Sequence, residues 1–245
     1  MSNCKFYPAG YTAALTHAVN ILQQQGYTVL TSPLQATHLL LPVPSFEPDG
    51  SVKGGGSIDA LLATLPKDIT ILGGNLVCDA LAGYKTVDFL QDPHYVAMNA
   101  NITAHCAIKL AMSKLPVTLD ACPVLVIGWG RIGKCLARLL RMLDADVTVA
   151  ARKASDRAVL ASLGYKAADT ATLDTTLYRV IFNTAPAMVS ASCPGNALKI
   201  DLASKPGLGS MDVLWAKGLP AREAPESSGK LIADTAIRAV TGKEL

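Results

Sequence analysis

Hydrophobic and polar residues alternate along the chain in blocks that predict strands and helices in turn. Short runs of β-branched or leucine residues are separated by longer segments with apolar residues at helical spacing. In residues 14–22, for example, apolar side chains recur at i, i+1, i+4, i+5 and i+8, and Gly26 follows as a helix stop. This order is typical of parallel sheets with crossover helices. The pattern therefore predicts an α/β protein.

The first part of the chain contains four predicted strands and one predicted helix. The strands are expected at 5–7, 27–30, 38–41 and 69–72, and the helix at 14–22. The third and fourth strands both run into loops. Residues 45–57, which follow the third strand, include Pro48, Asp49, Gly50 and three successive glycines. This stretch is therefore a candidate rim or lid of a binding site.

A second set of elements is predicted after Asn99, where a long helix runs to about Leu115. Strands and helices then alternate as in a dinucleotide-binding fold. The strands are expected at 124–127, 146–150, 179–183, 198–202 and 219–222, and the helices at about 131–143 and 155–163. Pro225 then precedes a segment with apolar residues at helical spacing, which could return to pack on the first domain.

These elements predict two domains. We expect an N-terminal domain at residues 1–98, completed by a helix at residues 226–245. A Rossmann dinucleotide-binding domain is expected at residues 99–225.

A glycine-rich turn stands between a predicted strand and a predicted helix, which is the setting that dinucleotide binding demands. Gly128 permits the tight turn, Gly130 lets the backbone approach a pyrophosphate, and Gly133 lets helix and strand pack closely. The helix N-terminus adds N–H donors and partial positive charge. A turn that merely needs small residues is the alternative. The expected contacts are Gly128, Trp129, Gly130, Arg131, Ile132 and Gly133.

The residues after the next strand bear on the choice between the two nicotinamide coenzymes. A site that prefers NAD places Asp or Glu there to hold the ribose 2′-hydroxyl, and this chain has none at that strand end. It has Ala151, Arg152, Lys153 and Ser155 instead. Arg can clamp a 2′-phosphate and Lys can neutralise it, so the sequence favours NADP over NAD. A solvated basic loop is the alternative, and Asp156 weakens the positive field.

Two further strand ends are expected to border the coenzyme, because ligands of open parallel sheets lie beyond the carboxyl ends of the strands. The expected contacts are Asn183, Thr184, Ala185 and Pro186 after one strand and Ser204 after the other. Asp201, within an apolar strand, is interpreted as a buried hydrogen-bonding partner rather than a catalyst. Lys205 is the better chemical candidate.

Composition and charge exclude several other classes of protein. Apolar residues make up 50% of the chain and charged residues 17%, which indicates a compact protein with a sizeable core. The net charge of +3 is spread along the chain and aromatic residues are 5%, which argues against nucleic-acid binding. With no apolar stretch of membrane-spanning length and no signal-peptide core, we expect a cytoplasmic protein.

The cysteines and histidines do not indicate a metal site. The six cysteines, Cys193 among them, lack CxxC spacing, and the four histidines lack paired spacing. We therefore expect free thiols in a reducing compartment and no bound metal, rather than disulfides or metal ligands.

Short segments across nearly the whole chain carry a family resemblance. They are Leu40-Leu41-Pro42-Val43, Ile71-Leu72-Gly73-Gly74, Asn99 through Leu110, Asn183-Thr184-Ala185-Pro186, Leu202-Ala203-Ser204-Lys205-Pro206-Gly207, Gly218-Leu219-Pro220, and Ala224-Pro225 with Ser228-Gly229. In this order they resemble the A subunit of dipicolinate synthase. The resemblance implies the fold of the D-2-hydroxyacid dehydrogenases: an N-terminal flavodoxin-like domain, a doubly wound Rossmann domain, and a final helix that crosses back to the first domain.

The resemblance also implies a reaction and a partner. The family's activity is the oxidation of dihydrodipicolinate, or of its hydrated form, to pyridine-2,6-dicarboxylate with NAD(P)+, on a branch of the lysine pathway used in sporulation. The protein must then orient the ring against the nicotinamide and hold two carboxylates. The B subunit of dipicolinate synthase is implied as a partner, and we expect a homo-oligomer.

Two residues are candidates for carboxylate binding or proton transfer, Lys205 and His105. Asn101, His105 and Lys109 recur at i, i+4 and i+8, and this polar stripe either faces a ligand or is simply solvated. The backbone N–H groups of Gly74 and Asn75 are expected to help. The expected substrate-binding residues are Gly74, Asn75, Thr103, Lys205, Leu219 and Pro220.

The chain departs from the family pattern at positions that bear on the substrate. His105 and Cys106 stand where the family usually shows Glu and Gly, Lys205 where it tends to show Arg, and Glu226 where Lys is common. Two alternatives therefore stay open. One is an NADP-dependent reductase or dehydrogenase of another keto or imino acid, and the other is a non-catalytic NADP-binding subunit or sensor.

Overall fold

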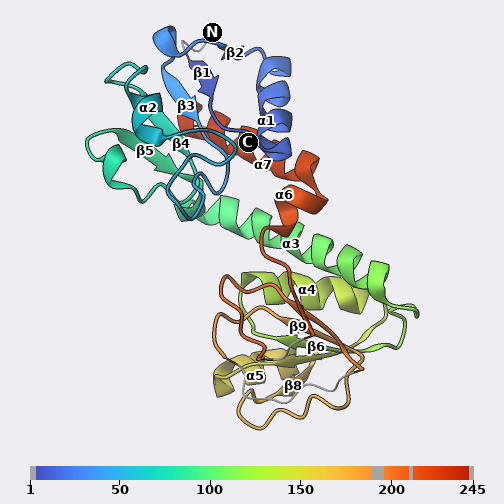
Figure 1. Ribbon diagram of the computed structural model, residues 1–245. Coiled ribbons are helices and arrows are strands. Elements are labelled where there is room, and N and C mark those ends of the chain that lie inside the picture. The colour runs from blue at the N-terminus through green and yellow to red at the C-terminus, as the bar shows by residue number, and fades with distance from the viewer. Residues whose placement is uncertain (1–3, 189–195, 210–211, 243–245) are drawn as a thin grey trace. The chain divides into compact units, whose positions relative to one another are not determined.

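The computed structural model describes residues 4–188, 196–209 and 212–242, in two compact units (Figure 1). Unit 1 consists of Met1–Asn99 and Pro220–Leu245, and unit 2 of Ala100–Leu219. Cys193 and the first three residues lie outside the described part, whereas Cys4, Cys78, Cys106, Cys122 and Cys135 are free thiols.

Unit 1 contains a five-stranded parallel sheet in the order β2-β1-β3-β4-β5, which is the flavodoxin-like order. Its strands are β1 (Lys5–Pro8), β2 (Thr28–Val29), β3 (His38–Leu40), β4 (Thr70–Gly73) and β5 (Lys85–Asp88). Consecutive residues such as Leu39 and Leu40 are both fully buried. A strand covered on both faces needs apolar side chains without alternation, and this explains the continuous apolar runs in the sequence.

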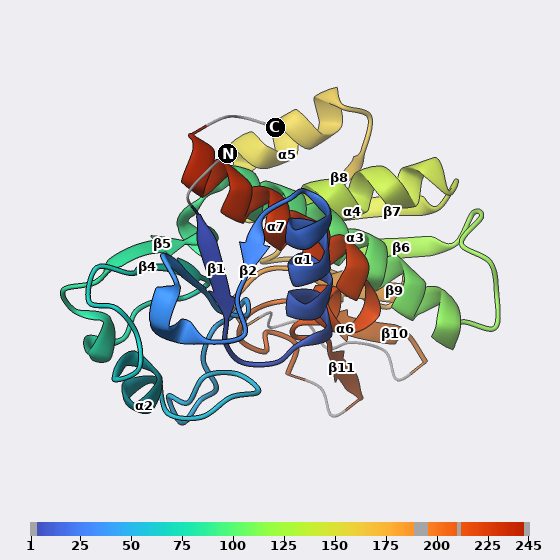
Figure 2. The same cartoon turned by 90° about the horizontal axis from the view of Figure 1, so that it is seen from above.

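The helices of unit 1 begin at recognisable caps. Helix α1 (Ala13–Gln24) starts after Thr12, whose hydroxyl accepts the N–H of Leu15 at 3.1 Å. Helix α7 (Pro225–Thr241) starts with a proline, packs along α1 and so returns to this unit (Figure 2). Shorter elements are α2 (Ile58–Leu62) and 3-10 turns at Pro33–Gln35, Asp79–Leu81 and Phe89–Gln91.

Unit 2 contains a six-stranded parallel sheet in the order β11-β10-β9-β6-β7-β8. Its elements are β6 (Pro123–Ile127), α4 (Arg131–Met142), β7 (Asp146–Ala150), α5 (Ala154–Ser162), β8 (Lys166–Ala168), β9 (Val180–Asn183), β10 (Leu198–Asp201) and β11 (Val213–Trp215). Counted from β6, this is the doubly wound Rossmann order, with its switch point between β6 and β9. The predicted α/β class, with a flavodoxin-like sheet and a Rossmann sheet, is confirmed.

The strand predicted at 219–222 is wrong. These residues form helix α6 (Leu219–Glu223), and the edge strand of the sheet is β11, a few residues earlier. Gly218 turns the chain at a φ of 70° just before the helix. Pro220 cannot donate a ladder hydrogen bond but fits the first turn of a helix, so the short apolar run becomes helical.

The long helix α3 (Pro93–Lys114) starts earlier than the pattern predicts. Pro93 occupies its first turn, and the carboxylate of Asp92 accepts the N–H of His94 at 2.9 Å. The sequence pattern places the start of this helix after Asn99, at the expected domain boundary, because the cap formed by Asp92 is not recognised from the pattern.

Candidate functional site

A cavity of about 1000 Å³ lies beside the carboxyl ends of β6, β7 and β9 in unit 2. Strand order reverses between β6 and β9, so the cavity occupies the place where sheets of this kind bind their ligands. The lining residues come from four loops: Ile127 to Gly130, Ala150 to Lys153 with Asp156, Thr170 to Leu173, and Thr184 to Met188.

The glycine turn at one side of the cavity is shaped by close packing. Gly128 has a φ of 104°, which side-chain-bearing residues rarely adopt. A Cβ on Gly133 would overlap the carbonyl oxygen of Gly128. The hydroxyl of Thr184 donates to the carbonyl of Ile127 at 2.9 Å and thereby ties the turn to the end of β9. Gly128 and Gly133 are therefore required by the protein itself.

Gly130 differs from its two neighbours because the protein does not require it to be glycine. Its φ of −83° and ψ of −169° suit any residue, and an added Cβ would meet no protein atom within 4 Å. The position lines the cavity and precedes α4, whose first turn receives no side-chain cap. The open space and uncapped N–H groups fit a pyrophosphate that approaches the backbone closely.

The loop after β7 carries the predicted 2′-phosphate residues. Ala151, Arg152 and Lys153 line the cavity, whereas Ser155 does not. Arg152 and Lys153 are exposed and bring two positive charges to this end of the cavity.

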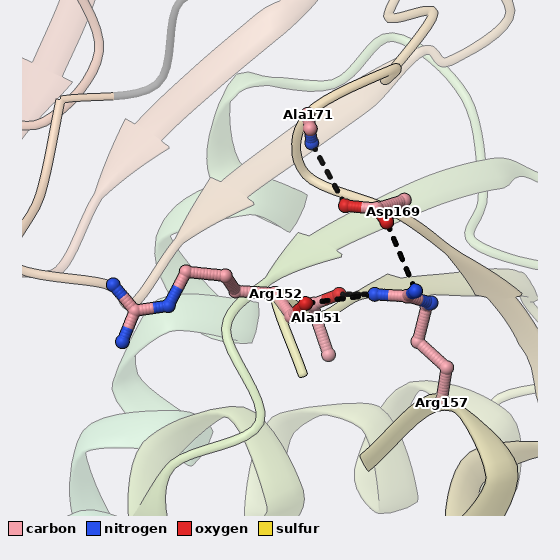
Figure 3. A network of polar contacts seen from close by, with 5 residues as sticks. All are labelled: Ala151, Arg152, Arg157, Asp169 and Ala171. Carbon is pink, nitrogen blue, oxygen red and sulfur yellow. Dashed lines mark hydrogen bonds and ion pairs between the residues drawn. The ribbon is translucent and has the colours of Figure 1, made fainter. Parts of the chain in front are cut away.

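Two residues that the sequence reasoning missed hold this loop (Figure 3). Arg157 of α5 donates to the carbonyls of Ala151 and Arg152 at 2.9 and 2.8 Å and pairs with Asp169 at 2.9 Å. No periodicity or motif in the sequence marks either member of this pair.

The opposite end of the cavity is held by a buried network. Asn183, predicted to contact the coenzyme, is fully buried, and its amide nitrogen donates to Asp201 and to the carbonyl of Ala185, both at 3.1 Å. Its oxygen accepts the N–H of Ala185 at 3.1 Å. These bonds use the side chain within the protein, so Asn183 shapes the loop from Thr184 onward rather than offering its amide to a ligand.

Asp201 is the acceptor at the centre of this network. Beyond Asn183, its fully buried carboxylate accepts the N–H groups of Ala203, Gly207 and Leu208 at 2.9, 2.7 and 3.1 Å. The interpretation of Asp201 as a buried hydrogen-bonding partner is confirmed. The bonds anchor both ends of the loop that carries Ser204 and Lys205, which are exposed and do not line the cavity.

The predicted substrate residues in the first unit offer fewer free groups than expected. The N–H of Gly74 donates to the hydroxyl of Ser45 at 3.0 Å, and the N–H of Asn75 donates to Asp88 at 2.9 Å. Both N–H groups thus have partners within the protein. The expected help of Gly74 and Asn75 in substrate binding stays a prediction.

The remaining substrate candidates differ in exposure. His105 lies on α3 with its side chain exposed, whereas Thr103 is buried. Leu219 is fully buried in the first turn of α6, and Pro220 beside it is half-buried. The structure thus gathers the predicted coenzyme residues Gly128, Trp129, Gly130, Ala151, Arg152, Lys153, Thr184, Ala185 and Pro186 around one cavity. It leaves Arg131, Ile132, Gly133, Ser155, Asn183 and Ser204 outside the lining.

The described residues contain neither a cluster suited to a metal ion nor a helix suited to cross a membrane. In that part of the chain, no group of three or more His, Cys, Asp or Glu side chains is arranged to hold a metal ion. None of its helices combines the length and apolar character that crossing a bilayer requires.

Comparisons of both sequence and structure find similarity to the A subunit of dipicolinate synthase. No protein-family model matches the chain. It is 29% identical over 170 residues to the A subunit of dipicolinate synthase of Bacillus subtilis (strain 168), a match covering 63% of this chain and 57% of that protein. The matched region thus spans little more than half of the curated relative.

Two solved structures share the fold over almost their full lengths. The A subunit of dipicolinate synthase from Bacillus halodurans has a TM-score of 0.85 at 21% identity, over 98% of each chain. The corresponding protein from Bacillus subtilis has a TM-score of 0.81 at 22% identity, over 100% of this chain and 99% of that one. The chain resembles the A subunit of dipicolinate synthase. This finding confirms the resemblance predicted from the sequence, and the likeness to dipicolinate synthase covers the elements of both units.

Proposed function

We propose that this chain is an NADP-dependent oxidoreductase of the kind represented by the A subunit of dipicolinate synthase, acting in sporulation. Its reaction would be the dehydrogenation of dihydrodipicolinate, or of its hydrated precursor, to pyridine-2,6-dicarboxylate. The observation that carries the proposal is the cavity at the Rossmann switch point, with Gly130 open on one side and Arg152 and Lys153 at one end. Self-association and a second, different subunit belong to the proposal as well.

The residues of unit 2 would divide the work of holding the coenzyme. Gly130 and the uncapped first turn of α4 would take the pyrophosphate, and Arg152 with Lys153 would take the 2′-phosphate. Thr184 and Ala185 would flank the nicotinamide ribose, on a loop fixed by Asn183. When bound, NADP supplies the hydride acceptor.

The chain's own residues would hold the substrate and take its proton. Aromatisation of the ring removes one hydride and one proton, so the protein must orient the ring, bind its carboxylates and accept the proton. Lys205 and His105 are exposed and can bind a carboxylate, and the imidazole of His105 is the candidate to take the proton. Asp201 would act indirectly, because it anchors the loop on which Lys205 lies.

The coenzyme half of the proposal is tested by binding. Thermal-shift and calorimetric titrations of the full chain with NADP+ and NAD+ should show a larger stabilisation by NADP+. Gly130→Ala should weaken both coenzymes, because the added methyl group occupies the space that the pyrophosphate needs, while leaving the melting temperature almost unchanged. Gly56→Ala is the matched control, since that glycine too meets no protein atom within 4 Å. Absence of binding to either coenzyme would refute the proposal.

The substrate half is tested by turnover. Dihydrodipicolinate with NADP+ should yield the ultraviolet absorbance of the aromatic product, and Lys205→Ala should raise KM or abolish turnover. An unchanged kcat and KM would remove Lys205 from the site. Turnover of another keto or imino acid in preference would favour the alternative enzyme, and coenzyme binding without turnover of any acid would favour a non-catalytic subunit.

A further inference from the structure

One ion pair joins two walls of the cavity (Figure 3). The guanidinium of Arg157 donates through Nη1 to the carbonyl oxygens of Ala151 and Arg152, at 2.9 and 2.8 Å. Through Nη2 it contacts the carboxylate of Asp169 at 2.9 Å. A single side chain therefore fixes the backbone at the end of β7 and reaches the loop that follows β8.

The carboxylate of Asp169 continues the connection. Its other oxygen accepts the N–H of Ala171 at 3.0 Å, and Ala171 lines the cavity. The N–H of Ala151 also donates to the carbonyl of Ala168 at 3.0 Å, next to Asp169. Arg157 and Asp169 thus connect the wall at residues 150–153 to the wall at residues 170–173 and fix their relative position.

The pair also affects the charge at this end of the cavity, which Arg152, Lys153 and Asp156 line. Asp169 is an acidic group near the strand end at which sites that prefer NAD place a carboxylate. Here Arg157 neutralises it, and the side chain of Arg152 extends in the opposite direction from Arg157 (Figure 3). The positive charges of Arg152 and Lys153 are therefore not offset by an unpaired Asp169.

We propose that Arg157 is a positioning residue for coenzyme choice and that Asp169 is the carboxylate whose charge it masks. Arg157 holds the loop so that Arg152 and Lys153 meet a 2′-phosphate, and it masks the carboxylate that would repel this phosphate. The inference rests on the proposed function and deepens it, since it concerns the same cavity.

A purely stabilising role predicts a different result. The side chains of Arg157 and Asp169 are 26% and 34% exposed, and partly exposed ion pairs contribute little to stability. Positioning instead predicts a selective effect on NADP+, because NAD+ lacks the phosphate that an unmasked carboxylate would repel. The ratio of the two dissociation constants therefore separates the two roles.

The experiment measures dissociation constants of NADP+ and NAD+ by calorimetry on full-length variants. Arg157→Ala should weaken NADP+ by about tenfold or more and NAD+ by less than about threefold. Asp169→Asn keeps the acceptor for Ala171 but removes the charge, so NADP+ affinity should not fall. The double variant Arg157→Ala with Asp169→Asn should recover part of the preference for NADP+ over NAD+ that Arg157→Ala loses.

Two further variants complete the test. Arg157→Lys keeps the positive charge but lacks the planar guanidinium fork. Its ratio of the NAD+ to the NADP+ dissociation constant should therefore lie between those of the wild type and Arg157→Ala. Arg141→Ala is the matched control, because Arg141 also donates to a carbonyl, that of Leu163 at 2.8 Å, but Leu163 does not line the cavity as Ala151 and Arg152 do. It should leave both constants unchanged.

The outcomes separate the two proposals. Wild-type protein that binds neither coenzyme, or that prefers NAD+, overturns both the proposed NADP dependence and this inference. Wild-type protein that prefers NADP+ while Arg157→Ala and Arg157→Lys keep the same ratio overturns this inference alone. Equal weakening of both coenzymes in these variants also overturns it, because that is the result of a structural role.

Discussion

The three glycines of one turn have three different surroundings, and the protein itself requires only two of them to be glycine. Gly128 adopts a left-handed φ, Gly133 has no room for a Cβ beside the carbonyl of Gly128, and Gly130 faces open space. The sequence motif already assigns a different role to each of these positions. The structure separates those that serve the fold from the one that a ligand would use, and the first kind can be tested by stability alone.

Gly133→Ala should destabilise the protein. The new methyl group would overlap the carbonyl oxygen of Gly128, so β6 and α4 must move apart, at a cost of about 3 kcal/mol of unfolding free energy. Chemical denaturation without coenzyme measures the loss, with Gly130→Ala as the control. Equal stability of the two variants would contradict this account of the turn.

Asp201→Asn should also destabilise the protein, although it conserves the shape of the side chain. All four partners of the Asp201 carboxylate are donors, so an amide group would turn an N–H₂ toward at least one N–H. We expect a loss on the order of 3 kcal/mol, measured by denaturation. Asp144→Asn is the control, because Asp144 is exposed with a φ of 56°, which asparagine tolerates. A neutral effect of Asp201→Asn would show that the network is not required.

At the scale of elements, the packing of α7 on α1 depends on a small residue. Gly229 of α7 lies against Ala14, His17 and Ala18 of α1, so close that a Cβ would stand 2.6 Å from the carbonyl oxygen of Ala14. The two helices can approach only because this side chain is absent.

Gly229→Ala should therefore lower the melting temperature. Alanine favours a helix by about 1 kcal/mol over glycine, but the overlap with α1 should exceed this gain and leave a net loss of about 1–2 kcal/mol. Ser227→Ala, at an exposed position of the same helix, should be neutral or slightly stabilising. Stabilisation by Gly229→Ala would mean that α1 and α7 are not in close contact.

At the scale of the whole molecule, one half-buried histidine predicts acid sensitivity. His38 packs on Phe6 with ring centroids 5.5 Å apart, and burial together with the nearby charge of Lys85 lowers its pKa below the usual 6.5. The unfolded chain then binds a proton that the folded chain does not, so stability should fall as the pH drops below 6.5.

The prediction is tested by comparing wild type with His38→Gln. The unfolding free energy of the wild type should fall more than that of the variant between about pH 8 and about pH 5, because only the wild type carries this titrating group. Urea denaturation at each pH measures the difference. Parallel curves for the two proteins would contradict the lowered pKa of His38.

Local patterns in the sequence predicted the sheets and the glycine turn. Buried parallel strands and a strand–turn–helix motif each depend on residues that are close together in the sequence. The pair Arg157 and Asp169 was not predictable in this way, since its contact depends on how two loops meet. The partners of Gly74 and Asn75 were missed for the same reason, because Ser45 lies in another loop and Asp88 at the end of β5. Short elements such as α6 were misread because a few apolar residues carry no clear period.

The division of the chain has a consequence for its synthesis. Residues 100–219 form a continuous unit, whereas the other unit needs residues 220–245 to join residues 1–99. As the chain leaves the ribosome, the Rossmann unit can complete its sheet while Ala14 and Ala18 of α1 still lack the cover of α7. Residues 1–99 are therefore translated before residues 100–219 but complete their fold after them, because the helix that packs on α1 is translated after both.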